Sequence, residues 1–160
     1  MAKRISETPA TRFLNAAGVL FQECSYDYLV HGGTAEAARQ LGREEHSIVK
    51  TLVMKSGDGK PLIVLMHGDR TVSTKNLARG IGTKSVVLCD QGEAQRHTRY
   101  QVGGTSPFGL LKPIPIYVEA SILDLESILI NGGKRGYLLQ IAPAVLVDEL
   151  QATPVTCAIL

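Results

Sequence analysis

Lys50 is the first residue whose type and position could do chemistry, because it is the one charged residue in an otherwise apolar segment. Residues 47–54, SIVKTLVM, have the composition of a buried strand, in which alternate side chains point to opposite faces. Either the face that carries Lys50 is solvated, with the aliphatic stem lying along the surface, or the ammonium group is directed into a cavity. Spacing alone favours the solvated lysine. In a cavity, the same cation would orient a bound substrate.

A glycine-rich segment, residues 102–109 (VGGTSPFG), is the second candidate. Gly103 and Gly104 would let the backbone approach a ligand closely, and its N–H groups could stabilise negative charge that develops on a carbonyl oxygen. A purely structural turn is an equally good interpretation, because Gly, Ser and Pro are common turn residues. The segment matches neither the dinucleotide-binding fingerprint nor the GxxxxGK[ST] phosphate loop.

A third segment, residues 132–136 (GGKRG), could place two cations beside a phosphate backbone. The ordinary alternative is a hairpin turn with two solvated charges. The cations that could together form a basic rim for a nucleic acid are Arg96, Arg99, Lys112, Lys134 and Arg135. Positions so far apart in the sequence do not show whether these side chains converge.

Familiar catalytic and metal-binding patterns are absent from the sequence. The histidines His31, His46, His67 and His97 have no HExxH or other closely paired spacing, so we expect no zinc site. There is no Gly-x-Ser-x-Gly elbow, and Cys89 lies in an expected strand, where a core position is more ordinary than a nucleophile. We therefore expect neither a metal nor a cofactor, and any chemistry must come from orientation and electrostatics.

Length and composition indicate the class of protein. A chain of 160 residues, of which 44% are hydrophobic and 20% charged, is most simply one domain, residues 1–160, with a sizeable core. The net charge of +2 does not suggest a general DNA-binding protein. Three widely spaced cysteines suit a reducing compartment, and no signal-peptide-like or membrane-spanning segment is recognisable. We expect a cytoplasmic protein that binds neither membranes nor DNA.

Glycine, proline and capping residues divide the chain into the elements that must position these segments. We expect helices that begin at Thr8-Pro9, at Thr34, at Ser73 or Thr74, at Asp90 and at Pro143. The expected strands cover residues 19–28, 47–56, 61–67, 84–89, 114–118, 127–130, 136–141 and 155–160. Many strands with a few short helices predict an α+β or mixed α/β fold around one curved sheet.

The three segments, in this order, resemble the YbaK/ProX family. The residues that carry the resemblance are VKTL (49–52), YQVGGTSP (100–107) and GGKRG (132–136), and the similarity runs over residues 8–150. Members of that family are aminoacyl-tRNA deacylases related to the editing domain of bacterial prolyl-tRNA synthetases. The resemblance implies a single domain with a mixed, partly barrel-like sheet flanked by helices. It also implies metal-independent hydrolysis of the ester that joins a wrong amino acid to tRNA, with prolyl-tRNA synthetase as a further partner.

The resemblance also implies roles for individual residues. Lys50 matches the strand lysine of the family, which interacts with the 3′ end of aminoacyl-tRNA, and Gly103 and Gly104 match the loop whose backbone approaches the scissile carbonyl. The predicted substrate-binding residues in or beside the matching segments are Thr51, Thr105, Ser106, Pro107, Asn131, Gly132 and Gly133. Tyr28 is predicted separately, because it could line a pocket near Lys50, although aromatic residues at a strand end usually serve packing. From the possible basic rim, the predicted tRNA-binding residues are Arg99, Lys112, Lys134 and Arg135.

Such a site would need no protein nucleophile. An ester is already activated, and one backbone N–H directed at the developing oxyanion contributes on the order of 3 kcal/mol. If the substrate is cysteinyl-tRNA, its own thiol could attack the ester once the site folds the substrate correctly.

Two positions depart from the cysteine-specific members of the family, which usually carry Ser directly before GGKRG and Asp two residues after it. Here these positions hold Asn131 and Leu138, and leucine cannot replace a carboxylate. The pattern therefore favours a general deacylase, with Cys, Ala, Ser or another small amino acid on tRNA(Pro). Two alternatives are a non-catalytic module that binds tRNA or a synthetase, and an enzyme of this fold that acts on another small ester.

Overall fold

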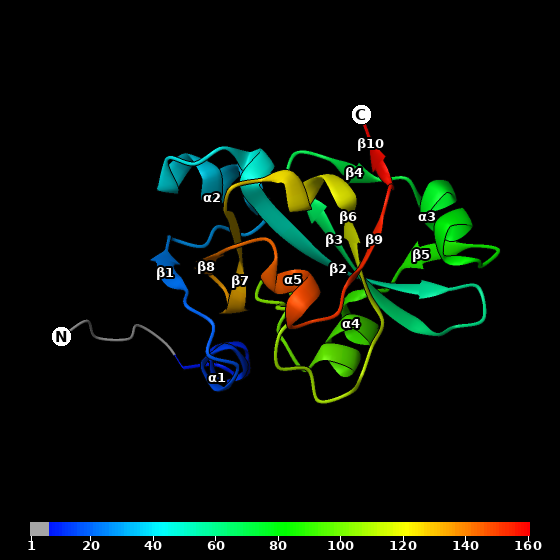
Figure 1. Cartoon of the computed structure of the whole chain (residues 1–160), viewed down its shortest axis with the longest axis horizontal. Helices are drawn as coiled ribbons and strands as arrows, with labels where there is room; N and C mark the ends of the chain where they lie inside the picture. The colour runs from blue at the N-terminus through cyan, green and yellow to red at the C-terminus, as the bar shows by residue number, and fades with distance from the viewer. Residues whose placement is uncertain (1–6) are drawn as a thin grey trace.

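One curved mixed sheet organises residues 7–160, the part of the chain that this computed structural model describes (Figure 1). Its strands are β1 (Gln22–Ser25), β2 (Ile48–Ser56), β3 (Pro61–His67), β5 (Val86–Leu88), β6 (Ile116–Glu119), β7 (Ile128–Lys134), β8 (Tyr137–Ile141) and β9 (Thr153–Val155). They follow the order β1-β8-β7-β2-β3-β6-β9, and β5 pairs with β2 beside this path. A separate two-stranded sheet is formed by β4 (Thr71–Val72) and β10 (Ala158–Ile159).

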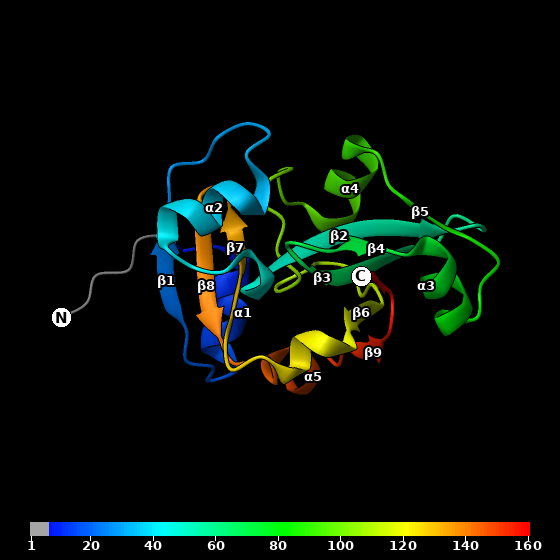
Figure 2. The same ribbon diagram turned by 90° about the horizontal axis from the view of Figure 1, so that it is seen from above.

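Parallel and antiparallel pairings both occur in the main sheet, which confirms the predicted mixed α/β fold. The pairs β2–β7, β3–β6 and β6–β9 are parallel, and the others are antiparallel. The helices are α1 (Pro9–Ala16), α2 (Gly33–Leu41), α3 (Thr74–Ile81), α4 (Gln91–Thr98) and α5 (Val145–Asp148). Figure 2 shows α1 and α2 on opposite faces of the part of the sheet that β7 and β8 form. Within residues 7–160, no helix is long and apolar enough to cross a membrane.

Both faces of the sheet are buried at its centre. Along β3, Ile63 and Leu65 join the largest cluster of buried side chains, whereas Val64 and Met66 join a second cluster, which packs against α3. Neighbouring residues of a strand point to opposite faces, so a strand that is covered on both faces must be apolar throughout. This burial explains why β3 is an uninterrupted apolar run.

Capping residues begin the helices largely where the sequence predicts. Thr8 and Asp90 form capping boxes at α1 and α4, and the Ser73 hydroxyl caps α3. Thr34 is a correction, because α2 begins at Gly33 and its cap has no side-chain hydrogen bond. The Thr34 hydroxyl instead donates to Glu45 Oε2 at 2.6 Å, which ties α2 to the segment that enters β2.

Several boundaries differ from the prediction at the margins of the sheet. β1 covers four residues of the predicted strand 19–28, and the predicted strand 155–160 is replaced by β9 and β10. α5 begins at Val145, two residues after the predicted start at Pro143. β7, in contrast, continues through the predicted turn as far as Lys134, with an irregular register between Asn131 and Lys134. Such a bulge redirects the chain locally, and here it brings β7 toward the glycine-rich loop.

Candidate active site

A gap in the pairing of β2 forms the centre of the site. One edge of β2 pairs with β3 along most of the strand. The other edge is shared by two strands, because β7 pairs with Ile48 and Val49, and the β5 ladder begins at Met54. Within the described part of the chain, residues 50–52 therefore have no neighbouring strand on this edge.

Thr51 directs its backbone toward this gap. A strand residue directs its N–H and C=O to the same edge, and the edge alternates from one residue to the next. The Val53 carbonyl accepts the Cys89 N–H at 3.0 Å on the β5 side, so Thr51, two residues earlier, faces the same side. The Thr51 hydroxyl is buried and has no hydrogen-bond partner among residues 7–160. Thr51 thus offers an amide donor and a carbonyl acceptor at one point.

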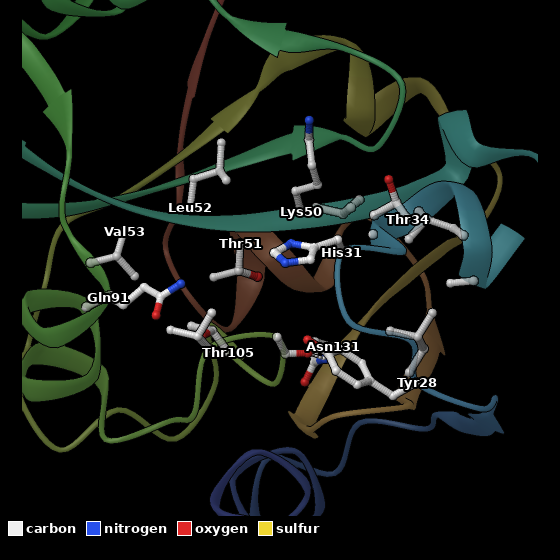
Figure 3. A pocket seen from close by; sticks show the side chains of 18 of the residues that line it. Tyr28, His31, Thr34, Lys50, Thr51, Leu52, Val53, Gln91, Thr105 and Asn131 are labelled. Carbon is white, nitrogen blue, oxygen red and sulfur yellow. Dashed lines mark hydrogen bonds between the residues drawn. The ribbon is translucent and has the colours of Figure 1, made fainter.

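A cavity of about 460 Å³ lies over the gap (Figure 3). Its walls come from β2, from the loop that enters α2, from the start of α4 and from the glycine-rich loop. The predicted site residues that line it are Tyr28, Lys50, Thr51, Gly103, Thr105 and Asn131. A cavity of this volume suits a small organic ligand and is larger than a single small amino acid requires.

Lys50 lies in the wall of this cavity and is half-buried. Its Nζ donates to the Arg70 carbonyl at 2.6 Å. Figure 3 shows that the Lys50 and Thr51 side chains extend in opposite directions from β2, as strand alternation requires. Burial lowers the pKa of Lys50, while the charges of Glu45 and Asp69 oppose this shift. One of its three N–H donors is used by Arg70, which leaves two for a ligand.

The glycine-rich loop contributes Gly103 to the cavity. Gly103 has a φ of +87°, and a Cβ at this position would lie 2.5 Å from the Tyr28 hydroxyl, so only glycine fits. Among residues 7–160, its N–H has no backbone acceptor. Gly104 is different, because it is buried behind the loop and its N–H donates to the Gln101 carbonyl at 2.8 Å. Of the two glycines, Gly103 is therefore the one that can offer an N–H to a ligand.

Asn131 fixes the position of this loop. Its Nδ2 donates to the Gly103 carbonyl at 3.2 Å, and its Oδ1 accepts the N–H groups of Gly133, at 2.7 Å, and Lys134, at 3.1 Å. The side chain thereby joins the bulge of β7 to the glycine-rich loop. Its amide group is largely occupied by the protein, so we interpret Asn131 as a positioning residue.

Arg135 forms a second link across the mouth of the site. Its Nε donates to the Val102 carbonyl at 2.8 Å, and its guanidinium lies 4.9 Å from the centre of the Tyr28 ring. Such a cation–π contact holds the tyrosine against the loop. Arg135 is nevertheless exposed and keeps part of its guanidinium open to solvent.

Several predicted substrate-binding residues lie outside the cavity lining. Ser106 and Pro107 are buried in the core behind the loop. The Gly132 carbonyl accepts the Thr8 hydroxyl at 2.6 Å, and a Cβ on Gly133 would lie 2.8 Å from the Tyr100 ring. These four residues support the loop and the bulge, and the structure does not bring them into contact with the cavity. The predicted tRNA-binding residues Arg99, Lys112 and Lys134 are exposed and also lie outside the lining.

The sequence analysis missed one side of the cavity. His31 lines it, and its positive φ of +64° is unusual for a residue other than glycine. An apolar end is formed by Ala37, Ile48 and Leu138, which belong to one buried cluster between α2 and the sheet. The sequence signal for His31 was the His-Gly-Gly turn before α2. At the apolar end, only Leu138 was marked in the sequence, by its departure from the cysteine-specific pattern, because the three residues come from separate elements.

A cluster of His46, His67 and Asp69 lies beside the Lys50 end of the site, and their ligand atoms are within 4.8 Å of one another. The two imidazole rings stack with centroids 3.8 Å apart and an angle of 8°. Lone pairs of parallel, stacked rings lie in separate planes, so both rings cannot point at one ion. His67 is further engaged through Nδ1 with the His46 carbonyl and through Nε2 with Ser121 Oγ, each at 2.8 Å. The cluster is therefore arranged as an internal hydrogen-bond network.

Comparison with known proteins places these features in context. The aminoacyl-tRNA editing domain family matches residues 32–149. EbsC of Enterococcus faecalis, provisionally named as a Cys-tRNA(Pro)/Cys-tRNA(Cys) deacylase, is 29% identical over 151 residues, and the match covers 92% of each chain. A proline–tRNA ligase of Staphylococcus aureus is 31% identical over 104 residues, which are 65% of this chain but only 18% of the ligase. The crystal structure of the hypothetical protein APE2540 matches with a TM-score of 0.87 and 26% identity, over 95% of this chain and 100% of that one.

Proposed function

The chain belongs to the aminoacyl-tRNA editing domain family, which confirms the resemblance seen in its sequence, and from this membership we propose how its cavity hydrolyses mischarged aminoacyl-tRNA. The observation that carries the proposal is the cavity over the unpaired stretch of β2, which Lys50, Thr51 and Gly103 all line. The name of EbsC makes tRNA(Pro) the first substrate to test. We further propose that the protein acts in trans, in the cytoplasm, on the products of prolyl-tRNA synthetase.

The backbone of the site is suited to stabilise the reacting carbonyl. Water attacks the ester carbon and the bond to the ribose oxygen breaks. One proton of the water passes to the ribose oxygen, which leaves as an alcohol, and the other passes to solvent, so the amino acid leaves as a carboxylate. Negative charge develops on the carbonyl oxygen during this step. We assign the N–H groups of Gly103 and Thr51 as its donors, each contributing on the order of 3 kcal/mol.

Lys50 has a separate role in this scheme. Its ammonium group holds the terminal nucleotide of the tRNA at one end of the cavity, away from the carbonyl donors. Partial burial strengthens this attraction, because the effective dielectric constant falls as water is removed. The hydrogen bond to the Arg70 carbonyl fixes the direction in which the remaining donors point. Lys50 thus positions the ester and does not attack it.

The apolar end of the cavity favours a small, uncharged amino acid side chain. Ala37, Ile48 and Leu138 form this end, and no carboxylate is among the described residues that line the cavity. The α-ammonium group of the substrate therefore needs another acceptor, and the free Thr51 carbonyl supplies one. Alanine or cysteine fits such an end, whereas a charged side chain would lose its hydration without gaining a partner.

Deacylation of Cys-, Ala- and Ser-tRNA(Pro) by the purified protein tests the proposal. We expect the protein to hydrolyse at least one of these substrates faster than the ester hydrolyses without protein. Lys50→Met should lower this enzymatic rate at least tenfold. Arg43→Met, which removes an exposed cation at the end of α2, is the control and should keep the wild-type rate. Binding of tRNA without hydrolysis would indicate the non-catalytic module instead. Hydrolysis of simple amino acid esters alone would indicate an esterase of the same fold.

A further inference from the structure

A second cavity, also of about 460 Å³, lies between α3 and the segment that enters β5. Its charged lining residues are Lys75, Arg79 and Lys84, and its hydroxyl-bearing lining residues are Thr74, Thr83 and Ser85. No carboxylate is among the described residues that line it. Cations and hydroxyl donors without a competing carboxylate are the groups that bind phosphate oxygens.

The chain segment that forms most of this cavity is basic. From Arg70 to Cys89 the sequence contains four basic residues and no acidic one. Among residues 7–160, none of the three lining cations forms an ion pair. All three are exposed, so they are accessible to a large polyanion. Like charges gathered without counter-charges repel one another, and a bound polyanion would relieve this repulsion.

β5 connects this second cavity to the active-site cavity. Val86 lines the second cavity, whereas Leu88 and Cys89 line the first. At a rise of about 3.3 Å per residue, Val86 and Leu88 lie two residues, or roughly 7 Å, apart. Val87, which lies between them, and Leu88 are 51% and 61% exposed, which gives an apolar surface for ribose or base faces. A short length of extended nucleic acid can bridge this distance.

We propose that the α3–β5 cavity binds backbone phosphates of the RNA strand whose 3′ end enters the active-site cavity. This inference rests on the proposed deacylase function and adds a second RNA-binding site to it. The strand would reach the ester over β5, from the side opposite Tyr28 and Arg135. This path differs from a basic rim made by Arg99, Lys112, Lys134 and Arg135.

The test compares two substrates that carry the same ester. One is the mischarged tRNA that the wild type hydrolyses, and the other is the same amino acid esterified to adenosine, which lacks the preceding phosphates. For Lys75→Ala/Arg79→Ala we expect KM for the tRNA to rise about tenfold with kcat unchanged, and no change for the adenosine ester. The slope of log affinity against log salt concentration should become shallower by roughly 1–2, because each lost phosphate contact removes about 0.7–0.9.

Arg12→Ala/Arg43→Ala is the matched control, because it removes two exposed cations from α1 and the end of α2, far from α3 (Figure 1). Equal effects of Lys75→Ala/Arg79→Ala on both substrates, or an unchanged KM and salt slope for tRNA, would overturn the proposal. Fluorescence anisotropy of uncharged tRNA measures binding without catalysis. It therefore distinguishes failure of the phosphate site from failure of the proposed deacylase function. If the wild type hydrolyses no ester, the same loss of affinity and shallower salt slope still support the phosphate site.

Discussion

Lys50 shows how its surroundings change the chemistry of a single residue. Burial lowers its pKa below the usual range for lysine, against the opposing charges of Glu45 and Asp69, so the charged form disappears at a lower pH than in an exposed lysine. We predict that kcat/KM for mischarged tRNA falls as the pH rises through this lowered pKa. Lys50→Arg should move the fall to higher pH, because a guanidinium stays charged.

Single-turnover rates, corrected for the spontaneous hydrolysis of the ester, provide the measurement. Identical pH profiles for wild type and Lys50→Arg would show that the charge of Lys50 does not control the rate. Burial of Lys50 was only one of two interpretations of the sequence, and the family resemblance decided between them. The contribution of Thr51 was less visible, because a free N–H and C=O depend on which strands pair with β2 and not on the residue type.

The glycine-rich loop is the element whose shape matters most for the site. Gly103 and Gly59 have similar φ angles, +87° and +82°, but only at Gly103 would a Cβ meet a neighbour, the Tyr28 hydroxyl. Alanine at either position should destabilise the protein by about 1 kcal/mol through backbone strain. We predict that only Gly103→Ala also lowers kcat/KM, by at least tenfold, because it displaces Tyr28 from the cavity wall.

Thermal unfolding and deacylation rates of these two variants separate the effect of backbone strain from the effect of displacing Tyr28. An equal loss of activity in Gly59→Ala would mean that general destabilisation, and not the position of Tyr28, explains the effect. Gly59 lies in the turn between β2 and β3, away from the cavity lining.

The central elements were predictable, and the marginal ones were not. β2 and β3 are long apolar runs joined by an Asp-Gly turn, so composition and local turn chemistry specify them. β1, β9 and β10 form only where a partner strand is available, and the bulge in β7 depends on the hydrogen bonds of Asn131. The same reasoning applies to the site, because its apolar end joins Ala37, Ile48 and Leu138, which only the tertiary fold brings together.

For the molecule as a whole, Glu119 connects the main sheet to the small one. This residue ends β6 and is 4% exposed. Its Oε1 accepts the N–H groups of Cys157, at 2.8 Å, and Ala158, at 3.1 Å, while its Oε2 accepts the Ser121 N–H at 3.0 Å. If residues 1–160 form one domain, as we propose, loss of this carboxylate should lower the stability of the whole chain in a single unfolding transition.

The pH dependence of stability provides the test of this connection. Burial alone would raise the pKa of Glu119, but its hydrogen-bond donors outweigh burial and the pKa is lowered. A carboxylate with a lowered folded-state pKa stabilises the protein above its unfolded pKa of about 4.3, and this stabilisation is lost as the pH falls through the folded value. We predict that Glu119→Gln lowers the free energy of unfolding by roughly 1–3 kcal/mol at pH 7, and that the difference shrinks in acid. Urea denaturation at several pH values measures this difference in the free energy of unfolding. Glu126→Gln, at an exposed residue, is the control. A difference from wild type that stays constant with pH would show that shape, and not charge, holds the C-terminal segment in place.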